Sequence, residues 1–147
     1  MSVHTDIRQA LETAVITATG YPAAAYRARE GRRFNADAAA NTESTWVRTT
    51  FIPNESRPAA MLSGTNIRKK YMGLFMVNVF VFEGKTNTLT EAETLADAIR
   101  DVFDPGGDGF TKNSTSIRIE YSERGQGLED SPWFNVPVTV SWYSYRT

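Results

Sequence analysis

Hydrophobic residues recur with helical spacing near the N-terminus. They form one stripe at Ile7, Leu11, Ala14, Val15 and Ala18, and polar residues such as Arg8, Gln9 and Glu12 occupy the other side. This spacing predicts an amphipathic helix of about four turns. Gly20 and the Tyr21-Pro22 pair are signals that end it.

A second helical pattern begins at Thr90. The residues Thr90-Glu91-Ala92-Glu93 have the sequence of a capping box, in which the threonine hydroxyl and the glutamate satisfy free backbone amides. The apolar stripe that follows consists of Ala92, Leu95, Ala96, Ile99 and Phe103. Asp104-Pro105-Gly106-Gly107 ends the predicted helix.

Four segments have the pattern of strands. Trp46–Ile52 is β-branched and aromatic and ends at Pro53, and residues 117–121 alternate between apolar and polar. Phe134–Trp142 shows the clearest alternation, and Pro137 within it indicates a sheet edge or a bulge. Tyr71–Glu83 is apolar on both alternating faces, so we expect a strand in the middle of a sheet or one whose second face a partner covers.

The segments between these elements are predicted to be irregular. Residues 21–45 read as a loop, with a short edge strand near Tyr26. Residues 53–67 read as a long loop, although they contain Met61, Leu62 and Ile67. The order α-β-β-α-β-β then predicts an α+β fold. We expect one domain, residues 1–147, with a four-stranded, mainly antiparallel sheet and two helices packed on one face.

The composition of the chain excludes several classes of function. The chain has 147 residues, 41% of them hydrophobic and 22% charged, with a net charge of −1. This balance is ordinary for a globular protein and gives no global attraction to nucleic acid or an anionic membrane. No apolar run approaches the ~20 residues of a membrane-spanning helix. There is no cysteine and a single histidine, so thiolate chemistry and histidine-rich metal sites are excluded.

The sequence Gly84-Lys85-Thr86 follows an apolar strand and precedes a helix, which is the order of parts in a phosphate-binding P-loop. That motif needs another glycine five positions before Gly84, and Val79 stands there. It also needs the helix to begin at the lysine and threonine, so that free amides meet the phosphate. The predicted helix begins later, at Thr90. We therefore interpret these residues as a surface turn and expect no cofactor.

Other candidate sites have simple structural interpretations. His4, with Asp6 or Glu12, is expected to form a solvent-facing pair on the first helix. Calcium binding is one interpretation of Asp97, Asp101, Asp104 and Asp108, but the order of an EF-hand loop is absent. Lys69-Lys70-Tyr71 with Phe75 suggests a basic and aromatic strip for nucleic acid, whereas a charged strand end that enters a core is the preferred interpretation. Arg27, Arg29, Arg32 and Arg33 belong either to a solvated loop or to a contact surface for an acidic partner.

The linear pattern of the chain supports a family resemblance. Arg68-Lys69-Lys70-Tyr71-Met72-Gly73-Leu74 enters the long apolar strand, and a turn at Glu83-Gly84 precedes the helix from Ala92 to Phe103. The far end contains Trp133-Phe134-Asn135-Val136-Pro137-Val138-Thr139-Val140-x-Trp142-Tyr143. This pattern resembles the tail terminator, or tail-completion, proteins of long-tailed bacteriophages, the group that includes the lambda tail terminator.

The resemblance implies a structural virion protein and not an enzyme. It implies a homo-oligomer, a hexameric ring that caps the tail tube, ends its polymerisation and provides the surface that joins the head. Its expected partners are the tail tube protein and a head-completion or connector protein. Neither a membrane nor sequence-specific nucleic acid is an expected partner, although DNA passes through such a ring. The expected location is the head-proximal end of the tail in the virion, after synthesis in the bacterial cytoplasm.

No catalytic residue is carried over from the family. We expect subunit or partner contacts instead, at Arg27, Arg29, Arg32, Arg33, Arg57, Met61, Leu62, Lys69, Lys70 and Tyr71. Two alternatives stay open: another head–tail connector or head-closure protein, and, more remotely, a nucleotide-binding enzyme domain.

Overall fold

One long antiparallel strand pair forms the centre of the molecule. In the computed structural model, β4 (Asn66–Phe82) pairs with β8 (Trp133–Arg146) from Lys69↔Arg146 to Phe82↔Trp133. Both strands are rich in β-branched and aromatic residues, which suit a pleated, buried surface. The structure describes residues 2–54, 57–63, 66–85, 87–106, 109–112 and 115–146.

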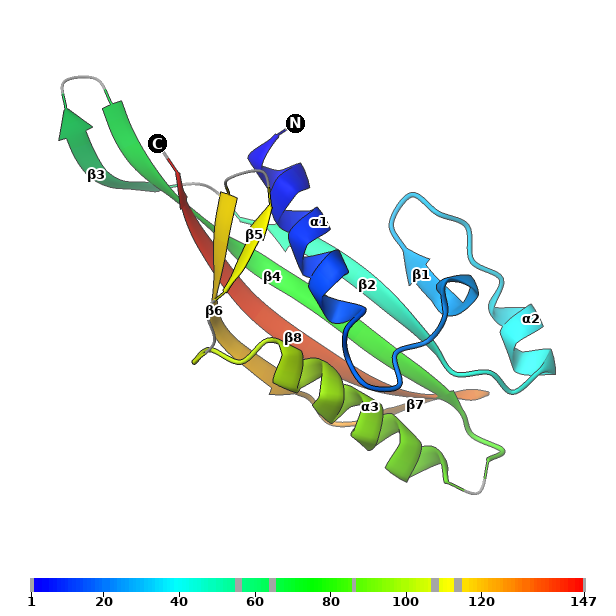
Figure 1. Ribbon diagram of the computed structural model, residues 1–147. Coiled ribbons are helices and arrows are strands. Elements are labelled where there is room, and N and C mark those ends of the chain that lie inside the picture. Colours follow the sequence, from blue (N-terminus) through cyan, green and yellow to red (C-terminus); the bar gives the residue numbers. More distant parts are fainter. Residues whose placement is uncertain are drawn as a thin grey trace.

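The other strands extend this pair on both sides. β2 (Trp46–Pro53) is antiparallel to β4, and β1 (Arg27–Arg29) lies parallel to β2 at one edge. β6 (Thr115–Arg124) pairs with β8, and β5 (Phe110–Lys112) pairs with β6. The sheet order is therefore β1-β2-β4-β8-β6-β5 (Figure 1). β3 (Arg57–Ser63) and β7 (Leu128–Asp130) pair with end segments of β4 and β8.

The predicted fold class, α+β with a four-stranded, mainly antiparallel sheet and two helices, is wrong. In the described residues the sheet has eight strands accompanied by three α-helices, so the fold is mostly β. Two of the unpredicted strands, β5 and β7, contain three residues each. Strands of this length show no detectable alternation, and only their pairing with longer neighbours defines them.

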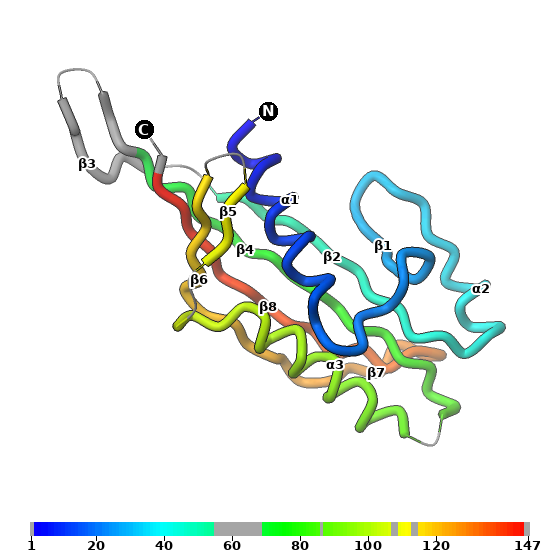
Figure 2. The backbone as a smooth tube through the Cα atoms, viewed as in Figure 1, coloured from blue at the N-terminus to red at the C-terminus, as the bar shows by residue number. Residues whose placement is uncertain are grey.

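Two helices cover one face of the sheet. α1 (Val3–Val15) and α3 (Thr88–Val102) lie on the same side of it (Figure 2). The Ser2 hydroxyl caps α1 by accepting a hydrogen bond from the Thr5 amide at 3.2 Å. The core between helices and sheet is fully buried, and its largest members include Ile7, Leu11, Phe75, Ile99, Phe103 and Trp142. Each such side chain contributes about 1.5–3 kcal/mol through burial.

A smaller aromatic cluster forms on the opposite face, at one end of the sheet. A 3₁₀ turn (Ala24–Tyr26) and α2 (Ala36–Asn41) bring apolar residues over this end. The Trp46 ring stacks between Phe34, at 4.6 Å, and Phe80, at 4.0 Å. Residues 21–45 are therefore not wholly irregular. The predicted edge strand near Tyr26 is present as β1, while α2 was missed because its sequence, ADAAAN, contains no large apolar residue.

The predicted loop at residues 53–67 is instead a hairpin. β3 pairs antiparallel with the first residues of β4, from Arg57↔Lys70 to Ser63↔Asn66, with two irregularities in register. β8 reaches only as far as Lys69 along β4. The hairpin of residues 57–63 and 66–70, here called the arm, therefore continues past the rest of the sheet as two strands. Figure 1 shows it extending from one end of the molecule.

Pro137 is not at a sheet edge, because β8 lies between β4 and β6. The Pro137 carbonyl accepts a hydrogen bond from the Gly125 amide at 2.8 Å. The amide nitrogen and carbonyl of one residue point to the same side of an antiparallel strand, so the missing N–H faces this side too. β6 ends at Arg124, opposite Val138, and β7 begins at Leu128, opposite Asn135. Proline is tolerated here because it faces the gap between two strands.

Candidate interaction surfaces

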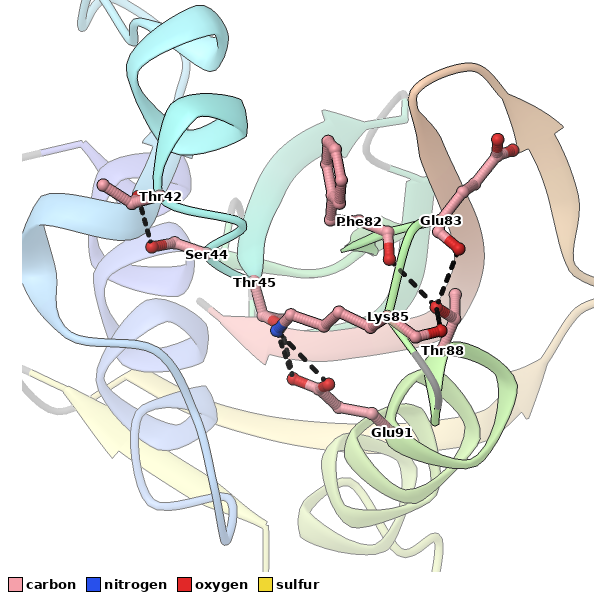
Figure 3. A network of polar contacts seen from close by, with 8 residues as sticks. All are labelled: Thr42, Ser44, Thr45, Phe82, Glu83, Lys85, Thr88 and Glu91. Carbon is pink, nitrogen blue, oxygen red and sulfur yellow. Dashed lines mark hydrogen bonds and ion pairs between the residues drawn. The ribbon is translucent and has the colours of Figure 1, made fainter.

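The Gly84-Lys85 turn is held by interactions that differ from those of a phosphate site. The Lys85 ammonium lies 3.4 Å from one carboxylate oxygen of Glu91. The other oxygen of this carboxylate accepts a hydrogen bond from the Thr45 hydroxyl. Figure 3 shows the Thr88 hydroxyl directed at backbone carbonyl oxygens, with those of Phe82 and Lys85 each 2.9 Å away. Carbonyl and carboxylate oxygens converge on this turn, and such groups repel an anion.

The predicted capping box at Thr90 is wrong. α3 begins at Thr88, two residues earlier, and its N-cap Asn87 makes no side-chain capping bond. The Thr88 hydroxyl instead fastens the first turn of the helix to the end of β4 through the Phe82 carbonyl. Thr90 is exposed within the helix. The start of α3 is thus determined by the tertiary contact of Thr88 and not by the capping-box motif at Thr90.

The acidic residues that suggest a calcium site contact arginines or the backbone. Asp97 lies 2.9 Å from the Arg124 guanidinium, and Asp101 lies 3.5 Å from Arg100. The Asp104 carboxylate accepts a hydrogen bond from the Gly106 amide. Among the described residues, no group of three or more histidine and acidic side chains is placed to hold a metal ion. Asp108 lies outside the described residues.

His4 does not form the expected solvent-facing pair. Its side chain is half-buried, and its ring packs edge-on against Tyr71, with 5.6 Å between ring centroids, and near Phe51. Of the two acidic residues proposed as its companion, Asp6 is buried and Glu12 lies 3.4 Å from the Arg8 guanidinium. His4 and Tyr71 therefore help attach the start of α1 to the sheet.

The four clustered arginines divide into two pairs. The Arg27 side chain donates to the Pro22 carbonyl at 2.7 Å and lies over the Tyr21 ring, while Arg29 lies 3.9 Å from the Glu12 carboxylate. These two, together with Arg32, line a small cavity of about 150 Å³. Burial raises the pKa of the Tyr21 phenol beside it, and the charge of Arg27 only partly opposes this change. Arg32 and Arg33 are exposed and form no ion pair with the described residues.

The predicted contact residues on the long strand lie on different sides of the sheet. Lys69 is exposed, whereas the Lys70 ammonium lies 5.1 Å from the ring centroid of Tyr143 and 6.0 Å from that of Tyr145. Tyr71 faces α1, as its contact with His4 shows. Sequence reasoning missed Tyr143 and Tyr145 because only the pairing of β8 with β4 brings them beside Lys70. The side chains of Arg57, Met61 and Leu62 lie outside the described residues.

Tyr71–Glu83 is in the middle of the sheet, as expected, because β4 lies between β2 and β8, but only one of its faces is buried throughout. Phe75, Val77, Val79 and Val81 point toward the helices and are fully buried. On the other face, Phe80 is covered by the aromatic cluster, but Leu74 and Met76 are only half-buried. The uncovered area, here called the open face, continues across β2, β8 and β6 through Ile52, Tyr143 and Tyr121. Ile52 is 42% exposed and Tyr121 38% exposed.

These features are those of a protein that acts through its surfaces. The described chain has an uncovered sheet face and an arm of two strands, and its broad surface hollows are lined by scattered polar groups. No described helix is long and apolar enough to cross a membrane. Such surfaces are typical of proteins that act by contact with other macromolecules.

The chain belongs to a family of phage tail terminator proteins, because the family model described as "Phage tail terminator protein" matches residues 6–142. It is therefore a structural protein of the bacteriophage tail and of the virion, as the sequence resemblance implied. This family assignment also supports association with other virion proteins.

One solved structure shares the architecture. One protein without a descriptive name is 22% identical, with a TM-score of 0.68, over 100% of this chain and 97% of its own. This likeness shows a shared fold. A chain from the virion of a native gene transfer agent particle is 12% identical, with a TM-score of 0.49, over 95% of this chain and 98% of its own. No curated protein matches the sequence.

Proposed function

We propose that the protein assembles into a closed homo-oligomeric ring, a hexamer, at the head-proximal end of the phage tail. The ring caps the tail tube, ends its polymerisation and provides the surface that joins the head. Its partners are further copies of the chain, the tail tube protein and a head-completion or connector protein, and DNA passes through its centre. The match to the tail terminator family over residues 6–142 carries this proposal.

Two surfaces of the subunit support assembly. A closed ring uses two different patches on every subunit, repeated head to tail. The arm is one such patch, because a hairpin of two strands is marginally stable at best without further packing. The open face is a further surface available for contacts with virion proteins, since it leaves Ile52 and Tyr121 partly exposed. Further proposed contacts are Arg27, Arg29, Arg32, Arg33, Arg57, Met61, Leu62, Lys69, Lys70 and Tyr71.

Electron microscopy of the purified protein tests the ring directly. We expect negative-stain images of rings with six-fold rotational symmetry, formed either in solution or on isolated tail tubes. Deleting the gene from its phage should leave tails of uncontrolled length that do not join heads. Tails of normal length, correctly attached to heads in the absence of the protein, would refute the assignment.

A further inference from the structure

Several exposed residues at the two ends of the β4–β8 pair carry charges of opposite sign. Arg32 and Arg33 are also exposed, next to Phe34 of the aromatic cluster, but the same segment carries the exposed acidic residues Asp37 and Glu43. At the arm end, Lys69 on β4 and Lys112 on β5 are exposed and form no ion pair with described residues. The sequence of residues 57–70 adds Arg57, Arg68 and Lys70 and contains no acidic residue. Asp6, at the start of α1 on this side, is buried. This part of the molecule is here called the basic end.

The opposite end of the same strand pair is acidic. Glu83 follows β4 directly, and Glu129 and Asp130 lie on β7 beside the start of β8. All three are exposed, and none has an ion-pair partner among the described residues. Lys85, the lysine nearest to them in the chain, is paired with Glu91. Two large apolar residues are exposed here as well, Leu89 at 57% and Leu128 at 58%. This part is called the acidic end.

We infer that the basic end of one copy docks on the acidic end of the next copy around the ring. This inference rests on the proposed ring and specifies its subunit contact. Figure 1 shows the arm at one end of the molecule and the β7–β8 turn at the other, so the two patches point away from each other. That is the placement that head-to-tail association of identical subunits requires.

Both the charges and the apolar residues have a role in this contact. Exposed ion pairs contribute little stability individually, but complementary charge fixes the orientation of partners and penalises the wrong one. Two basic ends, or two acidic ends, would repel each other. Binding free energy would come from burial of Leu89 and Leu128 against the arm, whose sequence contains Met61, Leu62 and Ile67. The neighbour would also give the two-stranded arm the packing that an isolated hairpin lacks.

A charge-swap experiment tests the contact. One variant carries Lys69→Glu and Lys112→Glu, and a second carries Glu129→Lys and Asp130→Lys. Each variant alone then opposes like charges at the substituted positions, so we expect its self-assembly to weaken by about ten-fold or more. An equimolar mixture should assemble again, because each altered end meets the complementary end of the other variant. Native mass spectrometry should detect rings that contain equal numbers of the two chains.

Two controls accompany the charge swap. Asp101→Lys alters an exposed charge in the last turns of α3, away from both ends, and should leave assembly unchanged. Thermal unfolding monitored by circular dichroism should give similar midpoints for all variants, since the substituted side chains are exposed and the ion pair of Asp101 with Arg100 is a surface pair. Raising the salt concentration should weaken assembly of the wild type and of the mixture alike.

The possible results separate this inference from the proposed function. Normal rings from either charge-reversed variant alone would overturn the end-to-end contact and leave the ring intact. The contact is equally overturned if both variants lose assembly and mixing does not restore it. If Lys69→Glu with Lys112→Glu forms normal rings but loses binding to a DNA fragment, the basic end is a surface for nucleic acid. Wild-type chains that stay monomeric even on tail tubes would refute the ring itself.

Discussion

The covered and open faces of the sheet differ although the same strands form both. On β4, Phe75 points toward α1 and α3 and is fully buried, while its neighbour Leu74 points the other way and is half-buried. Both residues are apolar, so hydropathy alone does not distinguish them. The covered face holds the subunit together, and the open face keeps apolar surface for contacts outside it. Apolar residues on both sides of a strand therefore indicate two different roles: one side packs in the core of the subunit, and the other is available for contacts with other chains.

Truncation of neighbouring side chains on β4 gives the largest expected contrast. Phe75→Ala should lower the free energy of unfolding by about 3–5 kcal/mol, because it leaves a cavity in the core. Leu74→Ala, the matched change on the open face, should cost roughly 1 kcal/mol or less in the isolated subunit. Urea denaturation of both variants measures the difference. Equal losses would mean that the open face is as closely packed as the covered one.

Gly73 is the position at which the covered face tolerates no side chain. A Cβ atom there would lie 2.3 Å from the Ile52 carbonyl oxygen and 2.7 Å from the Trp142 ring. Backbone on one side and a buried ring on the other cannot both move away, so Gly73→Ala should destabilise the fold by about 1–3 kcal/mol. Gly106→Ala is the control, since its Cβ would meet nothing closer than 3.5 Å. Similar thermal midpoints for the two variants would contradict this account.

The attachment of α3 to the covered face is sensitive to Thr88. Thr88→Ala removes the hydroxyl that lies 2.9 Å from the Phe82 and Lys85 carbonyls, at an expected cost of about 1 kcal/mol. Thr90→Ala should leave stability unchanged or slightly higher, because Thr90 is an exposed helical residue and alanine favours helices. Chemical denaturation of both variants measures their free energies of unfolding. A larger loss in Thr90→Ala than in Thr88→Ala would show that Thr90 does cap the helix.

The smallest effect is expected at Lys85. Its ion pair with Glu91 is partly exposed, so Lys85→Ala should change the free energy of unfolding by about 0.5 kcal/mol or less. We expect no ATP binding in the wild type, because carbonyl and carboxylate oxygens surround the turn. Isothermal titration calorimetry tests this point. A millimolar or stronger affinity that disappears in Lys85→Ala would show that the turn is a phosphate site after all.

Sequence periodicity predicted the elements whose side chains alternate or repeat over many residues. The first helix and the strands at Trp46, Tyr71 and Phe134 are present, although their limits differ. The arm was not predictable, because Pro58 and Gly64 lie in a stretch without alternation. Its strand β3 is defined by hydrogen bonds to β4, which sequence spacing does not encode. The start of α3 was misplaced for the same reason, since a hydroxyl contact to a distant strand overrides the local motif.

The candidate surfaces were predicted less well than the elements. The charges of Lys69 and Lys70 suggested contact residues, but their separate environments depend on strand register. The acidic end was missed because Glu83 and Glu129 are far apart in the sequence and meet only through the pairing of β4, β8 and β7. A local basic run such as residues 68–70 can be recognised in the sequence. A patch formed by residues from two separate hairpin turns can be recognised only in the folded structure.

The central position of β8 has a consequence for how a subunit forms. Its two neighbours, β4 and β6, both pair with β8 and do not pair with each other. The two halves of the sheet are therefore connected only after β8 has inserted between β4 and β6. Yet β8 follows both in the chain, and its contacts with β4 span long sequence separations such as Lys69 to Arg146. Closing such contacts is slow, and unpaired strand edges stay open to other chains in the meantime. During synthesis, exposed edges of β4 and β6 should therefore persist until β8 emerges from the ribosome.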